Sequence, residues 1–185
     1  MNSKRIVITG GPGTGKTSII NKLEELGFYC FHEIIRSMTL KAKEEGNPDT
    51  FISNPLAFVT DPFEFNKQLL NGRLEQYKKG EEINAESIFY DRATPDVLAY
   101  MNHFNQPYGK DFMETCKSHR YDTIFLLPPW EAIYISDNER LESFEEALLI
   151  HNRLEKIYTD LGYTVIEVPI GKVSERIQFI LEKIK

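Results

Sequence analysis

The sequence predicts an α/β fold, in which a buried parallel sheet carries helices on both faces. Short apolar runs rich in Val, Ile, Phe and Leu recur along the 185 residues, and such runs are typical of strands buried on both sides. Segments with helical periodicity separate the runs, and this repetition implies right-handed crossovers. A 41% share of hydrophobic residues is enough for one core, so we expect residues 1–185 to form a single domain.

Each expected strand is a short apolar run, as strands usually are. The strands are Arg5–Gly10, Gly27–His32, Ser87–Asp91, Asp122–Leu127 and Tyr163–Val168. The expected helices are Lys16–Leu26, Ile34–Glu45, Pro62–Lys79, Pro95–Asn105, Asp111–His119, Leu141–Leu161 and Val173–Ile184. Two of them have clear start signals, because Asp61 and Thr94 are good N-cap residues and each precedes a proline that suits the first helical turn.

The charge balance excludes some partners. The chain has 22 basic and 28 acidic residues, a net charge of −6, which argues against broad attraction to nucleic acid or anionic lipid. No stretch approaches the roughly 20 apolar residues of a membrane span, and the N-terminus lacks the apolar core of a signal peptide. We therefore expect a cytoplasmic protein with no membrane span and no nucleic-acid partner. Cys30 and Cys116 are expected to be reduced, structural thiols.

The segment from Gly10 to Thr17 reads GGPGTGKT and fits the phosphate-loop pattern G-x-x-x-x-G-K-[ST], directly after the first strand and before the first helix. Glycines let consecutive N–H groups surround a phosphate, and the helix presents its positive end to the same anion. Lys16 would reach the β and γ phosphates, and the Thr17 hydroxyl would bind Mg²⁺. The expected nucleotide-binding residues are Gly10, Gly11, Pro12, Gly13, Thr14, Gly15, Lys16, Thr17 and Ser18.

Two other interpretations of this segment are weaker. A merely tight turn between strand and helix would not require a lysine and a hydroxyl in succession. The dinucleotide pattern G-x-G-x-x-G is partly matched by Gly11, Gly13 and Gly15, but the third glycine is misplaced.

An acid and an arginine end the third expected strand. Asp91 follows the apolar run Ile88-Phe89-Tyr90, the place where phosphate-loop proteins hold Mg²⁺ directly or through water. Arg92 follows at once and would bring a permanent cation to a transferring phosphate or an anionic acceptor. The alternatives are a surface aspartate that starts a turn and a structural salt bridge.

Glu33 is the candidate general base. It follows the second expected strand, and Arg36 comes three residues later, which is one helical turn along the same face. Glu33 would accept the proton of an attacking hydroxyl, and Arg36 would orient the acceptor. The alternative is a glutamate that stabilises the dipole of its own helix.

A polar break at residues 136–140, within an expected lid over about residues 131–160, supplies another cation. Arg140 would neutralise charge on the oxygens in transfer, and Arg153 is the weaker candidate for this role. The four histidines, at positions 32, 103, 119 and 151, share no metal-ligand spacing, which argues against metal hydrolysis.

The motifs GGPGTGKT, HEIIR, FYDRATPDVLAY, FLLPPWE and DNERLESFEEALLIHNRL resemble a small AAA-type ATPase family. It contains the ribosylnicotinamide kinase domain of a bacterial NAD-synthesis regulator and an animal GTP-binding trafficking protein. The resemblance implies a P-loop NTPase three-layer sandwich, similar to nucleoside kinases, with sheet order 2-3-1-4-5. It also implies that Glu33, Arg36, Arg92 and Arg140 face the active cleft, with Asp91 near Mg²⁺.

These observations predict a Mg²⁺-dependent, ATP-binding phosphotransferase that acts on a small-molecule hydroxyl, such as that of a nucleoside. The catalytic residues would be Lys16, Glu33, Asp91, Arg92 and Arg140, with Glu33, Arg36 and Arg92 at the acceptor and Thr17 and Asp91 at the metal. The alternative is a regulatory switch that hydrolyses ATP or GTP slowly and binds a protein or lipid. No Asn-Lys-x-Asp guanine motif occurs, so ATP is preferred and GTP stays possible. Oligomeric state is not readable from the sequence.

Overall fold

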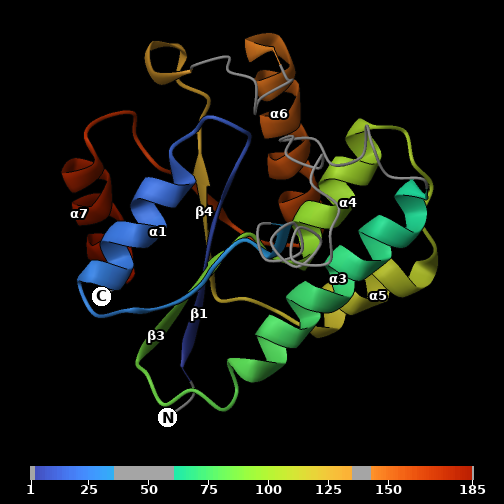
Figure 1. Cartoon of the computed structure of the whole chain (residues 1–185), viewed down its shortest axis with the longest axis horizontal. Coiled ribbons are helices and arrows are strands. Elements are labelled where there is room, and N and C mark those ends of the chain that lie inside the picture. Colours follow the sequence, from blue (N-terminus) through green and yellow to red (C-terminus); the bar gives the residue numbers. More distant parts are fainter. Residues whose placement is uncertain (1–2, 36–60, 135–142, 185) are drawn as a thin grey trace, which may run out of the picture.

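The computed structural model describes residues 3–35, 61–134 and 143–184, and its centre is one parallel five-stranded sheet (Figure 1). The strands lie in the order β2-β3-β1-β4-β5, so the expected fold class and strand order are confirmed. Their bounds are β1 Lys4–Gly10, β2 Tyr29–Phe31, β3 Ser87–Asp91, β4 Thr123–Leu127 and β5 Val165–Glu167.

The register of the central strands determines where the functional side chains meet. Ile8 of β1 lies opposite Asp91 of β3, and Gly10 lies opposite Leu127 at the end of β4. Because all strands are parallel, their carboxyl ends form one edge of the sheet, which is where ligands bind in open α/β folds. The turn after β1 and the acid that ends β3 are therefore neighbours.

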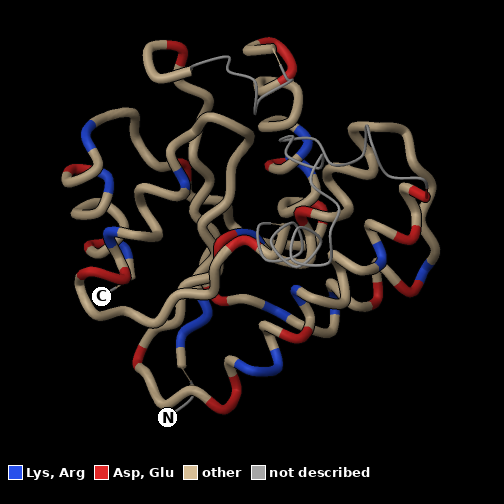
Figure 2. The backbone as a smooth tube through the Cα atoms, viewed as in Figure 1, with Lys and Arg blue, Asp and Glu red and all other residues tan. Residues whose placement is uncertain are grey.

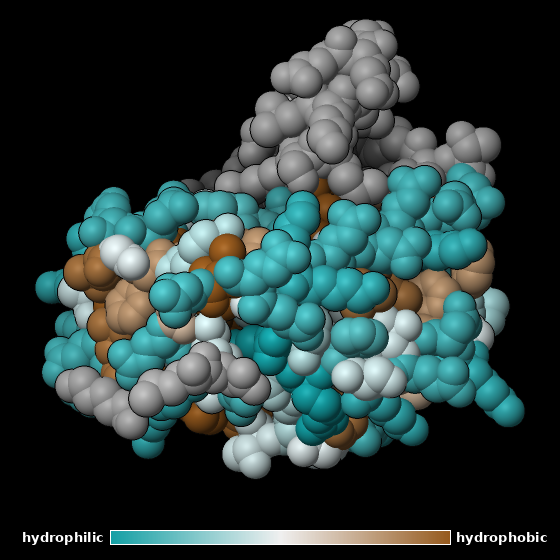
Figure 3. Space-filling model, turned by 90° about the horizontal axis from the view of Figure 1, so that it is seen from below, coloured by the Kyte–Doolittle hydropathy of each residue, from teal (hydrophilic) through white to brown (hydrophobic). Residues whose placement is uncertain are grey.

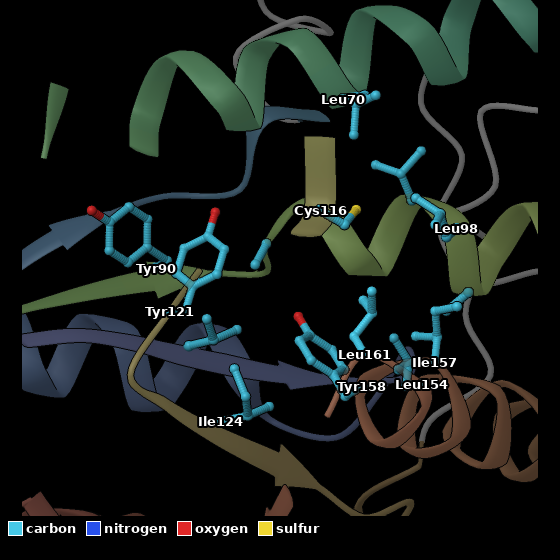
Figure 4. Close-up of a cluster of buried hydrophobic side chains, with 14 of the residues drawn as sticks. Leu70, Tyr90, Leu98, Cys116, Tyr121, Ile124, Leu154, Ile157, Tyr158 and Leu161 are labelled. Atoms are coloured by element: carbon cyan, nitrogen blue, oxygen red, sulfur yellow. The ribbon is translucent and has the colours of Figure 1, made fainter. Parts of the chain in front are cut away.

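Two apolar clusters cover the two faces of the sheet, as the alternation of side chains along a strand requires. Val7 faces a cluster with α3 (Pro62–Lys79), α4 (Thr94–His103), α5 (Lys110–Ser118) and α6 (Phe144–Asp160). Ile6 and Ile8 face a cluster with α1 (Lys16–Glu25) and α7 (Val173–Ile184). Figure 1 shows these helices on opposite sides of the strands. Figure 4 shows Leu154 and Tyr158 gathered with other buried side chains of the first cluster. Each fully buried aliphatic side chain contributes about 1.5–3 kcal/mol.

The described helices are α1 Lys16–Glu25, α3 Pro62–Lys79, α4 Thr94–His103, α5 Lys110–Ser118, α6 Phe144–Asp160 and α7 Val173–Ile184. Asp61 caps α3 as expected, since its carboxylate accepts hydrogen bonds from the N–H groups of Phe63 and Glu64. The expected cap at Thr94 was wrong by one residue. Ala93 is the N-cap of α4, and the Asp96 carboxylate accepts the Ala93 N–H bond.

Two regions differ in detail from the expected elements. A short 3₁₀ turn, Glu131–Ile133, follows β4, and no sequence signal indicated it. Of the expected helix Ile34–Glu45, only Ile34 and Ile35 lie within the described residues, where they are helical. The expected lid over residues 131–160 includes α6, whose apolar face packs into the core through side chains such as Leu154.

The surface shows no broad apolar face in the view of Figure 3, where hydrophilic side chains predominate and apolar ones form separate patches. Within the described ranges, no helix has both the length and the apolar character needed to cross a bilayer. Cys30 is half-buried, Cys116 is buried, and both are free thiols.

Candidate functional site

The turn that joins β1 to α1 depends on glycine at three positions with positive φ. Gly10 has φ 153°, Gly13 has φ 70° and Gly15, the N-cap of α1, has φ 83°. A Cβ atom at Gly10 would lie 2.6 Å from the Leu127 carbonyl oxygen. At Gly13 it would lie 2.7 Å from a carbon of the Tyr134 ring. The glycines therefore allow both the left-handed backbone and the close approach of neighbouring segments.

The loop is closed by two of its own side chains. The Thr14 hydroxyl donates a hydrogen bond of 3.0 Å to the Gly11 carbonyl oxygen. The Lys16 ammonium group donates a bond of 2.7 Å to the same oxygen. The Lys16 ammonium group thus lies at the N-terminus of α1, and the positive end of a helix favours an anion.

Residues from distant segments support the loop. The buried Arg176 of α7 donates a hydrogen bond of 3.0 Å to the Thr14 carbonyl oxygen. The main chain of Ala147, at the start of α6, lies 3.3 Å from the position of a Cβ at Gly11. Sequence reasoning missed Arg176, because 162 residues separate it from its partner and it belongs to no motif.

Lys16 connects the loop to a group of charged side chains. Burial and the neighbouring Arg92 lower the pKa of Lys16 from 10.5 to about 7, although Asp91, Glu33 and Asp96 act to raise it. The charges of these residues reach Lys16 because β1, β3 and the segment after β2 end at the same edge. The predicted phosphate loop and the predicted residues Glu33, Asp91 and Arg92 thus lie close together.

Glu33 lies between two arginines. Its Oε2 atom is 2.5 Å from Nε of Arg92, and its Oε1 atom is 3.1 Å from a guanidinium nitrogen of Arg73. The side chains of Glu33, Arg92 and Arg73 are only 12%, 10% and 4% exposed, so the ion pairs are shielded from water. Figure 2 shows acidic and basic stretches of the backbone meeting near the centre of the molecule.

The two arginines keep Glu33 ionised. Burial acts to raise the pKa of Glu33, but Arg73 and Arg92 outweigh it and hold the pKa below the usual value. A buried carboxylate requires such cationic partners, because without them its negative charge would be uncompensated and poorly solvated. Glu33 makes these contacts with other segments, so its role extends beyond the dipole of the helix that it begins.

Arg92 forms a second ion pair, with the buried carboxylate of Asp96. The Asp96 carboxylate is fully buried and accepts hydrogen bonds from the Thr9 hydroxyl, the Tyr158 hydroxyl and the Ala93 N–H. It also lies 3.3 Å from a guanidinium nitrogen of Arg92. The motif FYDRATPD contained this residue, but the sequence pattern indicated only a helix start.

Arg92 has an unusual backbone for a residue with a large side chain. Its φ is 71°, and its N–H donates a hydrogen bond of 3.0 Å to the Ile8 carbonyl oxygen. A left-handed conformation costs such a residue about 1–2 kcal/mol. Strain of this kind is concentrated at functional sites, where the surroundings enforce it.

Thr17 and Asp91, the residues expected at the metal, both lie within the described parts of the chain. Asp91 is buried at the end of β3, and Thr17 is half-buried in the first turn of α1. No cluster of three His, Cys, Asp or Glu side chains able to hold a metal occurs within residues 3–35, 61–134 and 143–184. The donors present suit an ion held jointly by protein and phosphates, as Mg²⁺ commonly is.

Other expected site residues are not brought together by the described parts of the chain. Arg36 and Arg140 lie outside the described residues. Arg153 is exposed on α6. Ser18 is also exposed, one residue beyond Thr17.

The chain matches a family model described as an AAA domain over residues 5–176. It belongs to this AAA-domain family. A curated relative from Pseudomonas fluorescens (strain SBW25), named nucleotide-binding protein, is 27% identical over 62% of this chain and 37% of its own length. A relative of the same name from Jannaschia sp. (strain CCS1) is 30% identical over 46% of this chain and 26% of its own length. The match therefore spans well under half of each relative.

Several solved structures, two of them of kinases, have the same fold. The NadR protein in complex with NAD and AMP-PNP has a TM-score of 0.72 at 16% identity, over 99% of this chain and 49% of that protein. Deoxyadenosine kinase from M. mycoides has a TM-score of 0.66 at 18% identity, over 97% and 98% of the two chains. Thymidylate kinase from Ehrlichia chaffeensis has a TM-score of 0.64 at 10% identity over both whole chains. The AAA-domain chain thus has the P-loop fold of nucleoside and nucleotide kinases.

Proposed function

We propose that this protein is a Mg²⁺-dependent phosphotransferase that moves the γ-phosphate of ATP to the hydroxyl of a small, nucleoside-like acceptor. The observation that carries the proposal is the pairing of Glu33 with two arginines beside Lys16 of the phosphate loop. An ionised carboxylate and a cation beside a phosphate site are the parts that phosphoryl transfer to a hydroxyl requires.

In this proposal the loop from Gly10 to Thr17 binds the phosphates through its N–H groups, and Lys16 neutralises their charge. Thr17 and Asp91 would hold the metal, which would supply positive charge to neutralise the charge that develops on the phosphates. Glu33 would accept the proton of the acceptor hydroxyl. Arg92 would stabilise the phosphoryl group in transfer, a contribution that Arg140 would share.

The acceptor end of the site favours a hydroxyl over a phosphate. The described arginines near Glu33, Arg73 and Arg92, already have carboxylate partners in Glu33 and Asp96. A kinase that accepts a phosphorylated substrate needs cations to bind that phosphate. The likeness to a structure solved with the ATP analogue AMP-PNP, in NadR, supports ATP as the donor, with GTP as the other donor to test.

The direct test measures ADP release from ATP and Mg²⁺ in the presence of nucleosides, nicotinamide riboside and sugars. We expect one acceptor class to stimulate turnover, and Glu33→Gln to lower the stimulated rate by about 10²–10⁴-fold, because the general base is removed. Glu82→Gln, an exposed glutamate outside the site, is the matched control. Slow hydrolysis that no acceptor stimulates, with nucleotide-dependent binding of a protein or lipid, would instead support the regulatory switch.

A further inference from the structure

Arg73 belongs to none of the sequence motifs, yet it contacts the proposed base. It lies on α3, where its side chain is 4% exposed. One guanidinium nitrogen is 3.1 Å from Oε1 of Glu33, and another donates a bond of 3.1 Å to the Ala93 carbonyl oxygen. The second bond ties Arg73 to the main chain at the start of α4. Its position is therefore set by the scaffold as well as by Glu33.

Arg92 occupies the other oxygen of the same carboxylate. Its Nε atom is 2.5 Å from Oε2 of Glu33, and its charge acts on the Lys16 ammonium group of the phosphate loop. Each oxygen of Glu33 is thus bonded to one guanidinium group, and these cations lower the pKa of the carboxylate. Glu33 becomes a stronger base when one arginine moves away. Of the two arginines, Arg92 is the one whose charge acts more strongly on Lys16 of the phosphate loop.

Resting on the phosphotransferase function above, we propose that Arg73 is a positioning residue that keeps Glu33 in place through Oε1 while Arg92 moves to the phosphoryl group. In this step the acceptor oxygen bonds to the γ-phosphorus, and the bond from that phosphorus to the β,γ-bridging oxygen breaks. The bridging oxygen keeps the electron pair and leaves with ADP. The hydroxyl proton passes to Oε2 of Glu33.

The division of roles has a physical reason. If Arg92 were the sole partner of Glu33, its departure would leave a shielded carboxylate with no opposite charge, and such a group takes up a proton or turns away. Arg73 prevents both results, because it is already bonded and does not have to move. A second arginine at the base thus permits the first one to act on the phosphate.

The test compares steady-state kinetics of variants with the acceptor identified above. We expect Arg73→Met to lower kcat by about 10-fold or more and to change the KM for ATP by less than about twofold, because the phosphate loop is intact. Arg73→Lys keeps the charge and should recover most of kcat. In a Glu33→Gln background, Arg73→Met should have little further effect, since the group it positions is gone. Lys67→Met, an exposed cation on the same helix, is the control.

A purely structural role for Arg73 would give a different result. It would lower kcat equally in both backgrounds, without recovery in Arg73→Lys, and this would overturn the proposal. If Arg73→Met does not fold, the proposal is tested by a crystal structure of the unaltered protein with an ATP analogue, Mg²⁺ and acceptor. Arg73 on Oε1 with Arg92 moved off Oε2 supports the proposal, and Arg92 still on Oε2 contradicts it.

The two proposals can fail separately. If no acceptor stimulates turnover by the unaltered protein, the phosphotransferase function is wrong and the role of Arg73 falls with it. If the unaltered protein is active and Arg73→Met matches it, only the role of Arg73 is wrong.

Discussion

Lys16 is the side chain at which the phosphate loop and the charged cluster meet. Its ammonium group bonds the Gly11 carbonyl oxygen at 2.7 Å and is affected by Arg92, Asp91 and Glu33. Because burial and Arg92 lower its pKa to about 7, this lysine is only partly protonated at neutral pH. A bound triphosphate would supply the negative charge that restores the proton.

Proton uptake should therefore accompany ATP binding. In the free protein the Lys16 pKa is about 7, and the phosphates raise it, so at pH 8 binding should take up about one proton. At pH 6 Lys16 is already protonated, so its proton uptake on ATP binding should be close to zero. Affinity should accordingly fall as the pH rises from 7 to 9. Calorimetry in buffers of different ionisation enthalpy measures the uptake, and equal uptake in Lys16→Ala would contradict this assignment.

Gly13→Ala tests the geometry of the loop. The new methyl group would lie 2.7 Å from the Tyr134 ring, so the ring would have to move. The left-handed backbone, with φ 70°, would also destabilise the fold by about 1–2 kcal/mol. We expect ATP affinity to fall by about 10-fold or more. The control is Gly27→Ala, which has φ 89° but no atom within 4 Å of its Cβ. It should lose similar stability and keep its affinity, and equal losses of affinity would contradict the role of the loop.

At the scale of elements, a buried hydroxyl of α6 is hydrogen-bonded to the site. The Tyr158 hydroxyl donates to Asp96, and burial together with the Asp96 charge raises the Tyr158 pKa well above its usual value. The hydroxyl therefore stays protonated and remains a donor. Through Asp96 it is connected to Arg92, so the packing of α6 on α4 helps to hold Arg92 in place.

Tyr158→Phe should lower the free energy of unfolding by about 1–2 kcal/mol, because a hydrogen bond to a charged, buried group is lost. It should also lower kcat more than the affinity for ATP, since Arg92 loses part of its support. Denaturant unfolding and acceptor-stimulated turnover measure the two effects. Tyr29→Phe, an exposed tyrosine of β2, is the control. A variant with unchanged turnover would show that Asp96 holds Arg92 without Tyr158.

Local patterns in the sequence were sufficient for the main elements and for the loop. Both ends of the helix Pro62–Lys79 could be predicted to the residue. Asp61 and Pro62 are a strong signal for a helix start, and the helical pattern of apolar residues stops after Lys79. β2 is shorter than expected, since only Tyr29–Phe31 pair with β3. The length of a strand depends on how many of its residues pair with the neighbouring strand. The pattern of apolar residues in one segment does not show this.

At the scale of the whole molecule, the sheet order decides which distant residues form the site. Placing β1 between β3 and β4 brings the loop beside Asp91 and Arg92, which the motif spacing could predict. Arg73 and Arg176 could not be predicted, because each is a single cation on an amphipathic helix, and such residues are usually solvated. Their roles depend on tertiary packing, which places Arg73 at Glu33 and Arg176 at Thr14.

The central claim is that the turn from Gly10 to Thr17 binds the phosphates of a nucleoside triphosphate, and titration calorimetry in magnesium buffer tests it most directly. The unaltered protein should bind ATP, or GTP if that is the donor, with one site per chain. Lys16→Ala should weaken binding by about 100-fold, as the loss of a charge-assisted contact to phosphate would. If neither nucleotide binds the unaltered protein, or if Lys16→Ala binds equally well, the account is contradicted.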